Sequence, residues 1–347
     1  MVRTLNRTRI TALSALVAAL APAGVRADPV PVPVVDLHVD LPWQLHFKGR
    51  GLGLTEGHAT ADALRRGGYA GVVLPIYLPD KAHADGAHID DAEAILATIE
   101  RLLGQGGVFA RPGAAPAAGQ LRGFLSIEGA SAFAADVTAI DRFIARGVRL
   151  IGVVHAKNGA LASSATDAPT GYGLTPVGKA FCRRVYERGA LIDVSHASDA
   201  AFADIADIAR EFGAPLVASH SNARAVADHP RNLPDAALRA IAASGGVVGA
   251  NFHAPFVAKK ASATLDDLAR QIEHMLRVAG VEHVAIGSDL DGGIRLPAGL
   301  TDAGSLPRLA AVLRARGLDE PSLRKLFAEN ALRVLLPPPP RPCAPAP

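Results

Sequence analysis

The sequence has very few cysteines: only Cys182 and Cys343 occur in 347 residues. Two thiols cannot form a disulfide framework, so the fold must rest on something else. Cys182 lies in a segment with helical spacing and is expected to be a buried free thiol. The state of Cys343, near the C-terminus, stays open, and so does a bridge between the two.

Two further features are missing once the first 27 residues are set aside. Those residues hold four of the 36 Lys and Arg residues and no acid, so 32 basic residues remain against 33 acidic ones and the net charge is −1. No cluster of Lys and Arg remains that would favour a nucleic-acid partner. No later apolar run is long enough to cross a membrane.

The N-terminal segment has the pattern of a secretory signal peptide. Arg3, Arg7 and Arg9 precede the apolar run 10–24, and Val25 and Ala27 give small residues at positions −3 and −1 of a cleavage site. The pattern predicts cleavage near Ala27 and a periplasmic or secreted protein. An uncleaved anchor is the alternative, which the shortness of the apolar run disfavours.

The rest of the chain predicts one domain, residues 28–336, followed by a proline-rich tail, residues 337–347, that is expected to be extended or disordered. Eight apolar runs rich in β-branched residues alternate with helical patterns. Alternation implies parallel strands, and eight such units in roughly 300 residues favour a closed (β/α)₈ TIM barrel over an open sheet. The predicted strands are 34–40, 71–77, 122–128, 148–155, 190–196, 215–220, 246–252 and 283–289. The predicted helices are 90–103, 137–147, 175–189, 198–213, 233–245 and 264–280, with loops at 78–90 and 104–119.

Metal-binding or acid–base side chains end most of these strands. The carboxyl ends of parallel barrel strands gather on one face, so residues far apart in the sequence can meet there. Asp36 should lie deeper on the same face as His38 and Asp40, because side chains two apart on a strand share a face. The residues at strand ends are His38, Asp40, Glu128, His155, His196, His220 and Asp289.

Three of the imidazoles and two of the carboxylates could hold two divalent cations. Nitrogen and oxygen ligands without thiolate favour zinc, with manganese or cobalt as substitutes. Glu128 could bridge the ions, with His38 and Asp40 completing one site and His196 and His220 the other. Two such metals activate a bridging water or hydroxide and clamp the reacting oxygens, which predicts a hydrolase.

Two strand-end residues remain outside this ligand set. His155 could donate a hydrogen bond to a developing oxyanion. Asp289 could carry a proton from water to a leaving amine. Both are therefore candidate catalytic residues.

The motifs DLHVDLPWQ, SIEGA, VVHAKN, IDVSHAS, ASHSNARAVADHPRNLPD and IGSDLDGG closely resemble the membrane (renal-type) dipeptidases, from about Val34 to Leu335. The resemblance implies a (β/α)₈ barrel with a binuclear zinc site that hydrolyses dipeptides and tolerates a D-residue at the C-terminal position. It suggests a homodimer, and some members open β-lactams. It implies that Arg231 pairs with the substrate carboxylate, that His155 faces the substrate and that Asp289 is the family's acid. It also implies that the metal ligands are His38, Asp40, Glu128, His196 and His220.

One departure and two alternatives accompany this resemblance. The family places an aromatic-rich segment on its second strand, whereas this chain has GVVLPIY, so that pocket wall should differ. Another binuclear amidohydrolase is disfavoured because such sites usually begin with HxH and use a carboxylated lysine as bridge. A relative that tailors or binds a secreted peptide metabolite stays open, since a fold does not fix a function.

Several polar residues near the motifs keep two interpretations each. Trp43 could wall the pocket or pack in the core, Asn158 could bind substrate or cap a loop, and Asp291 could exchange roles with Asp289. His229 could line the substrate loop. Most histidines away from strand ends are expected to face solvent, namely His46, His58, His83, His88, His229, His253, His274 and His283.

Overall fold

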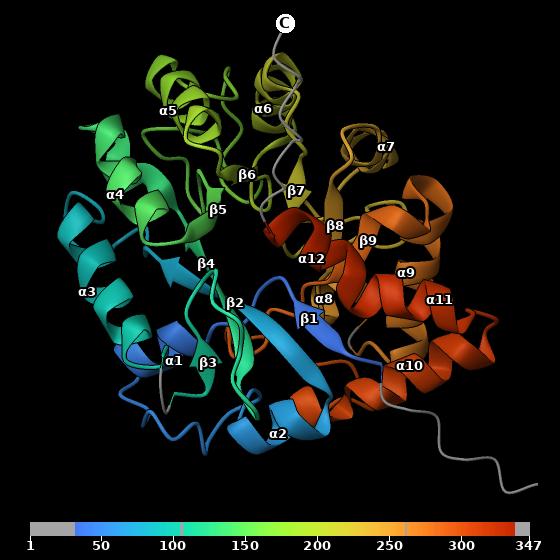
Figure 1. Cartoon of the computed structure of the whole chain (residues 1–347). Coiled ribbons are helices and arrows are strands. Elements are labelled where there is room, and N and C mark those ends of the chain that lie inside the picture. The colour runs from blue at the N-terminus through green and yellow to red at the C-terminus, as the bar shows by residue number, and fades with distance from the viewer. Residues whose placement is uncertain (1–31, 105–106, 261, 337–347) are drawn as a thin grey trace, which may run out of the picture. The chain divides into compact units, whose positions relative to one another are not determined.

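The computed structural model describes residues 32–104, 107–260 and 262–336, so the predicted signal peptide and the proline-rich tail lie outside the described residues. Eight parallel strands form a closed ring in the order β2-β1-β9-β8-β7-β6-β5-β4, and β2 pairs with β4 to close it. Figure 1 shows helices around the outside of this ring. The predicted (β/α)₈ barrel is confirmed. Its strands are β1 Val34–Asp36, β2 Tyr69–Tyr77, β4 Leu121–Glu128, β5 Val148–Gly152, β6 Leu191–Asp193, β7 Val217–Ala218, β8 Val247–Ala250 and β9 Val284–Ile286.

The helices follow the predicted alternation. The six predicted helices correspond to α3, α4, α5, α6, α7 and α9, and several begin at a capping side chain: Thr175, Ser198 and Thr264 each accept a hydrogen bond from a first-turn amide. The helices are α1 Leu41–His46, α2 Ala61–Arg66, α3 Ile89–Glu100, α4 Ile140–Ala145, α5 Pro176–Glu187, α6 Asp199–Phe212, α7 Asp235–Ala243, α8 Ala254–Val257, α9 Leu265–Ala279, α10 Leu306–Ala315, α11 Glu320–Arg324 and α12 Asn330–Leu335.

Six of the observed barrel strands are shorter than the predicted ones, β2 and β4 each begin slightly earlier than predicted, and one strand was not predicted. Val153 and Val154 are buried like strand residues, yet β5 ends at Gly152 and the chain then turns toward the barrel mouth. The predicted loop 104–119 contains the two-residue strand β3, Phe109–Ala110, which pairs with the start of β4. Such a short strand carries no alternating pattern from which it could be predicted.

The barrel interior is crowded where β7, β8 and β9 meet. A methyl group on Gly249 or on Gly287 would overlap the carbonyl oxygen of Ser219. Only glycine allows the three backbones to approach this closely. Ser219 immediately precedes His220, so this tight packing fixes the backbone beneath one of the candidate metal ligands.

The C-terminal helix α12 is bound to the opposite end of the barrel. Asn330 Nδ2 donates hydrogen bonds to the carbonyls of Val281 and Val284, at 2.7 and 2.8 Å. Arg333 donates to the carbonyl of Glu282 at 2.6 Å. These contacts secure the entry to β9 and leave the carboxyl ends of the strands free. Among the described ranges, no helix is long and apolar enough to span a bilayer.

Candidate active site

The residues predicted at strand ends gather at one mouth of the barrel. Glu128 is the last residue of β4, and the others lie in the two to four residues that follow their strands. A pocket of about 320 Å³ opens there, and Trp43 forms part of its wall. The pocket is also lined by Asp40, Glu128, His155, His196, His220, Arg231 and Asp289.

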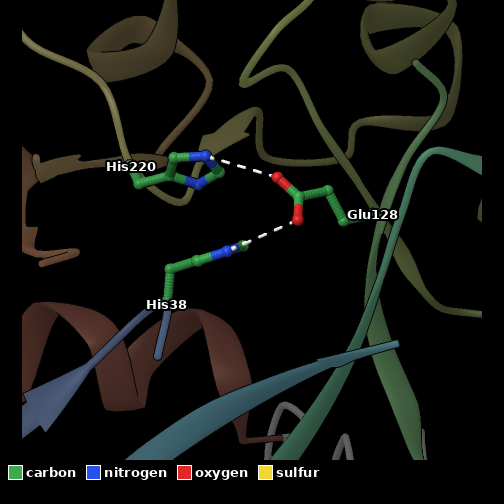
Figure 2. Close-up of side chains that lie close together, drawn as sticks. All are labelled: His38, Glu128 and His220. Atoms are coloured by element: carbon green, nitrogen blue, oxygen red, sulfur yellow. Dashed lines mark ion pairs between the residues drawn. The ribbon is translucent and has the colours of Figure 1, made fainter. Parts of the chain in front are cut away.

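The carboxylate of Glu128 lies at the centre of the cluster. Its Oε2 is 3.7 Å from His38 Nε2, and its Oε1 is 2.9 Å from His196 Nε2 and 3.6 Å from His220 Nε2. Figure 2 shows the two oxygens facing different imidazoles. Asp40 Oδ2 lies 3.4 Å from His38 Nε2. One carboxylate therefore faces imidazoles on two sides, as a bridging ligand requires.

Three overlapping groups of side chains have ligand atoms within 4.8 Å of one another. Glu128 belongs to two of them, and His155 lies closer to the ligands than its predicted substrate-side role required, 3.9 Å from Glu128 Oε1. The groups are His38 with Glu128 and His220, Glu128 with His155 and His196, and His38 with Asp40 and Asp289.

The hydrogen bonding of the cluster fits bound cations. Both ring nitrogens of His38 and Nδ1 of His196 are buried and have no hydrogen-bond partner among the described residues. Unpaired buried polar atoms are costly, and a cation held at His38 Nε2 would supply a partner for that nitrogen. Imidazole nitrogens and carboxylate oxygens without sulfur are the donor set of zinc and related borderline metals.

Electrostatics divides the imidazoles into two kinds. Burial opposes charge on His38, but the carboxylates of Asp40 and Glu128 outweigh it and raise the pKa of His38 to about 10. Burial and the nearby charges of Arg231 and His38 lower the pKa of His220 well below its usual range, and burial does the same to His196. The latter two rings are neutral and ready to bind a cation, whereas His38 would release a proton on binding one.

A second layer of polar groups orients the ring of His220. Ser219 Oγ lies 2.7 Å from His220 Nδ1 and donates to Asp193 Oδ2 at 2.5 Å. The Nδ1–H of His220 therefore donates to Ser219, which leaves Nε2 free to bind a cation. The carboxylate of Asp193 is fixed in turn by the backbone amides of Ser195 and Ser219.

Asp36 fixes the strand end that carries His38. Its carboxylate accepts from the amides of His38 and Ser288, at 3.1 and 2.8 Å, and from the hydroxyl of Tyr69. Burial raises the pKa of Asp36, although these hydrogen bonds oppose the rise. Asp36 is thus a buried hydrogen-bonded acid below the cluster, in the position that its spacing from His38 predicted.

The backbone adopts a rare conformation at the site. Of the four non-glycine residues with left-handed φ among the described residues, three lie here: His196 at 70°, Asp289 at 64° and Asp291 at 66°. Such residues cost roughly 1–3 kcal/mol each and persist where the surroundings hold them in place. Asn251 Nδ2 donates to Asp289 Oδ2 at 3.0 Å and fixes that carboxylate. Burial and the charge of Asp40 raise the pKa of Asp289 well above its usual range.

Arg231 is a buried cation that faces the pocket. Its side chain donates to the carbonyl of His220 at 3.2 Å and lies against Phe256, 5.7 Å from the ring centre. No carboxylate lies within 4.0 Å of it among the described residues. Burial lowers the pKa of Arg231, but a guanidinium stays charged. A buried cation without a counter-ion is suited to bind an anionic group of a ligand.

His155 is oriented by a residue that sequence reasoning missed. Asp80 Oδ2 lies 3.3 Å from His155 Nδ1 and accepts from the amide of Ala156 at 3.2 Å. Burial lowers the pKa of His155, but Asp80 and Glu128 outweigh it and raise the pKa. Asp80 follows the end of β2 by three residues, so the strand-end pattern that indicated the other site residues could have indicated it as well.

Two other residues of the site were missed or misplaced. Asn251, which fixes Asp289, follows β8 directly, but its neutral amide is not among the metal-binding or acid–base groups that mark the other strand ends. Most histidines away from strand ends were expected to face solvent, and that expectation is wrong: of these, only His83 and His88 are exposed, and His253 is half-buried and lines the pocket. Burial and the nearby charge of Arg295 lower the pKa of His253 to about 4, so its ring is neutral at physiological pH.

The structure decides between most of the alternatives left open above. Asp291 accepts from the amides of His58 and Ala59, at 2.9 and 3.0 Å, and so anchors a loop instead of sharing the role of Asp289. Asn158 caps its own loop, with Oδ1 accepting from the Ser164 amide. In α5, Cys182 is a buried free thiol.

Comparison with known proteins places this barrel among metal-dependent hydrolases. A metallopeptidase from Rhodobacter sphaeroides, solved with a phosphinate mimic of the dipeptide L-Ala-D-Ala, is 30% identical and superposes with a TM-score of 0.77, covering 88% of this chain and 99% of that chain. Dipeptidase verJ from Clonostachys rogersoniana is 28% identical over 333 residues, 88% of this chain and 84% of the relative. An uncharacterized Klebsiella pneumoniae protein encoded in the pqqA 5' region is 42% identical over 218 residues, 60% of this chain and 79% of the relative.

A family model also matches nearly the whole chain. The profile of the membrane dipeptidases, peptidase family M19, matches residues 29–337. The chain belongs to this family, and it is a metallopeptidase of the dipeptidase type.

Proposed function

We propose that the protein is a binuclear zinc dipeptidase that hydrolyses dipeptides, including those with a C-terminal D-residue. One observation carries the proposal: Glu128 presents one oxygen to His38 and the other to His196 and His220. A shared carboxylate between two sets of nitrogen ligands is the arrangement that brings two divalent ions together. The ligands would be His38, Asp40, Glu128, His196 and His220.

A zinc pair held by these residues would supply Lewis-acid catalysis and would lower the pKa of a water at the site. The side chains around it have separate tasks. Asp289, whose pKa is raised by burial and by Asp40, is suited to accept the proton of the attacking water and pass it to the leaving amine. His155, turned by Asp80, donates to the oxyanion that forms at the carbonyl.

Arg231 would set which peptide bond is cleaved. The free carboxylate of a dipeptide would pair with this buried guanidinium while the peptide bond lies over Glu128, and any peptide bond farther from the C-terminus of a longer chain would have no carboxylate at that distance. The phosphinate mimic of L-Ala-D-Ala bound by the Rhodobacter metallopeptidase supports a D-residue at the C-terminal position. The side-chain preference should depend on Tyr77, which lines the pocket from the strand that lacks the family's usual aromatic segment.

A dipeptide panel tests this function. We expect the zinc-loaded protein to release amino acids from L-L and L-D dipeptides, to lose activity with a chelator, and to spare dipeptides with an amidated C-terminus. Arg231→Ala should lower kcat/KM for free-carboxylate substrates, and the drop should correspond to a loss of roughly 2–4 kcal/mol of transition-state stabilisation. Arg239→Ala, which removes an exposed arginine of α7, is the matched control and should leave kcat/KM unchanged.

Two results would contradict the proposal. No turnover of any dipeptide by zinc-loaded protein would exclude a dipeptidase. Cleavage of amidated and free dipeptides at equal rates would exclude the role of Arg231 and favour a general amidohydrolase.

We also infer export to the periplasm or the exterior, from the leader pattern of residues 1–27, and a homodimer, from the family resemblance. N-terminal sequencing of the exported protein should begin near Asp28. A chain that retains its first residues in the membrane fraction would instead indicate an uncleaved anchor.

A further inference from the structure

We propose that His83, His88 and Asp91 form a second binding site for a borderline divalent cation such as Zn²⁺, separate from the barrel centre. The three side chains have ligand atoms within 4.8 Å of one another. They lie on the segment between the end of β2 and the first turn of α3 and share no residue with the candidate active site.

The exposure of the two imidazoles is unusual for this chain. All 12 histidines fall within the described residues, and His83 and His88 are the two that are exposed, with side chains 46% and 51% accessible. Their rings nevertheless stack, with centres 4.4 Å apart and planes 18° from parallel. Two exposed side chains held together in this way keep one nitrogen of each ring within 4.8 Å of the other and of an Asp91 oxygen.

Carboxylates surround the paired rings. His83 Nε2 lies 3.1 and 3.0 Å from the two oxygens of Asp91, and His88 Nε2 lies 3.0 Å from Asp85 Oδ1. Exposed pairs of this kind contribute little to stability, so a cation that replaces them displaces little. Two imidazoles with carboxylate and no thiolate favour zinc, copper or nickel over magnesium or calcium.

The backbone holds these donors in place without a ligand. His83 and Gly86 exchange two backbone hydrogen bonds, at 3.1 and 3.2 Å, which closes a tight turn between the two histidines. The amide of His88 donates to Asp91 Oδ2 at 2.7 Å and fixes this carboxylate at the start of α3. The donors span only nine residues, so little chain entropy is lost when a cation joins them.

A cation here would restrain the loop next to the active site. Asp80, which orients His155, lies three residues before His83 on the same segment. Joining His83 to the first turn of α3 would shorten the part of this loop that is free to move. The site is therefore a metal-dependent brace on the segment that carries Asp80.

Counting bound zinc tests the proposal on the full chain. We expect His83→Ala and, separately, His88→Ala to bind one Zn²⁺ fewer than the wild type at about 10 µM free zinc, as measured by equilibrium dialysis. The double variant should lose the same single ion. His274→Ala is the matched control, because His274 Nε2 also pairs with a carboxylate, that of Asp235 at 2.7 Å, and belongs to no group of metal-type donors among the described residues.

The test compares the number of bound zinc ions in each variant with the number in the wild type. It therefore does not depend on how many ions the barrel centre holds or on any hydrolysis. Thermal unfolding confirms that each variant is folded. Equal zinc counts in the wild type and in His83→Ala would overturn the proposal, as would an equal loss in His274→Ala.

Discussion

Hydroxyl groups next to the metal-type ligands decide which ring nitrogen faces the centre. Ser219 connects Asp193 to His220 Nδ1, and this chain of hydrogen bonds fixes both the tautomer and the ring plane. The neighbouring Ser221 is buried too, but its hydroxyl has no partner among the described residues. Two similar serines on either side of one histidine therefore have different consequences for cation binding.

Ser219→Ala should lower zinc affinity by roughly 10–100-fold, because the variant leaves His220 Nδ1 and Asp193 without their shared partner. Competition with a chelating dye measures this directly, without reference to activity. Ser221→Ala removes an unpaired hydroxyl and should leave the affinity unchanged. If both variants bind zinc as the wild type does, Ser219 has no orienting role.

At the scale of residues, sequence reasoning found groups that carry metal or acid–base chemistry and end a strand, such as Glu128 and His220. It missed Asp80 and Asn251, which touch no proposed ion and act through a neighbour. Asp80 follows β2 as the other acids follow their strands, so the strand-end pattern could have indicated it. The role of Asn251 depends on which loops meet, and a strand pattern does not contain that information. The environment of His253 was predicted wrongly because this residue lies in the turn after β8. Beyond the end of a strand, side chains no longer alternate between two faces, so the sequence does not indicate which way the residue points.

At the scale of elements, alternation and β-branched content located every barrel strand, but the predicted end was correct only for β2 and β4. Apolar residues continue past the last ladder pair, as Val153 and Val154 do after β5, because they pack inside the barrel mouth. Hydrophobicity reports burial, and it does not distinguish a strand from buried extended chain. Helix ends were closer because a capping side chain or a left-handed glycine marks them, as Gly213 does for α6.

The contact of β7 with β8 and β9 requires glycine for steric reasons alone, since Gly249 does not have left-handed φ. Gly249→Ala should lower the free energy of unfolding by roughly 2–3 kcal/mol, because the added methyl overlaps the Ser219 carbonyl oxygen. Urea unfolding measures the change. Gly171→Ala is the control: nothing lies within 4 Å of a methyl group there, and its φ is ordinary. An unchanged midpoint for Gly249→Ala would show that the strands can separate without cost.

For the whole molecule, the candidate centre connects distant parts of the chain. His38 follows the first strand, Glu128 ends β4 and His220 follows β7, so cations held among them would join strands across the barrel. Buried acids also crowd there, and burial together with the nearby charge of Asp40 raises the pKa of Asp289. Bound cations would relieve this repulsion only in the folded state.

We therefore expect cation binding and folding stability to be coupled. Ligands present at about 1,000 times their Kd stabilise a folded protein by roughly 4 kcal/mol per site, so a chelator should lower the Tm by about 10 °C or more in a domain of this size. Glu128→Gln should lose one or both ions and show a smaller response to chelator, because a carboxamide is a poor bridge. Glu187→Gln, an exposed position on α5, should respond as the wild type does. If the wild-type Tm is the same with and without chelator, the cluster does not hold cations tightly enough to stabilise the barrel. The binuclear proposal would then fail, and so would the bridging role of Glu128.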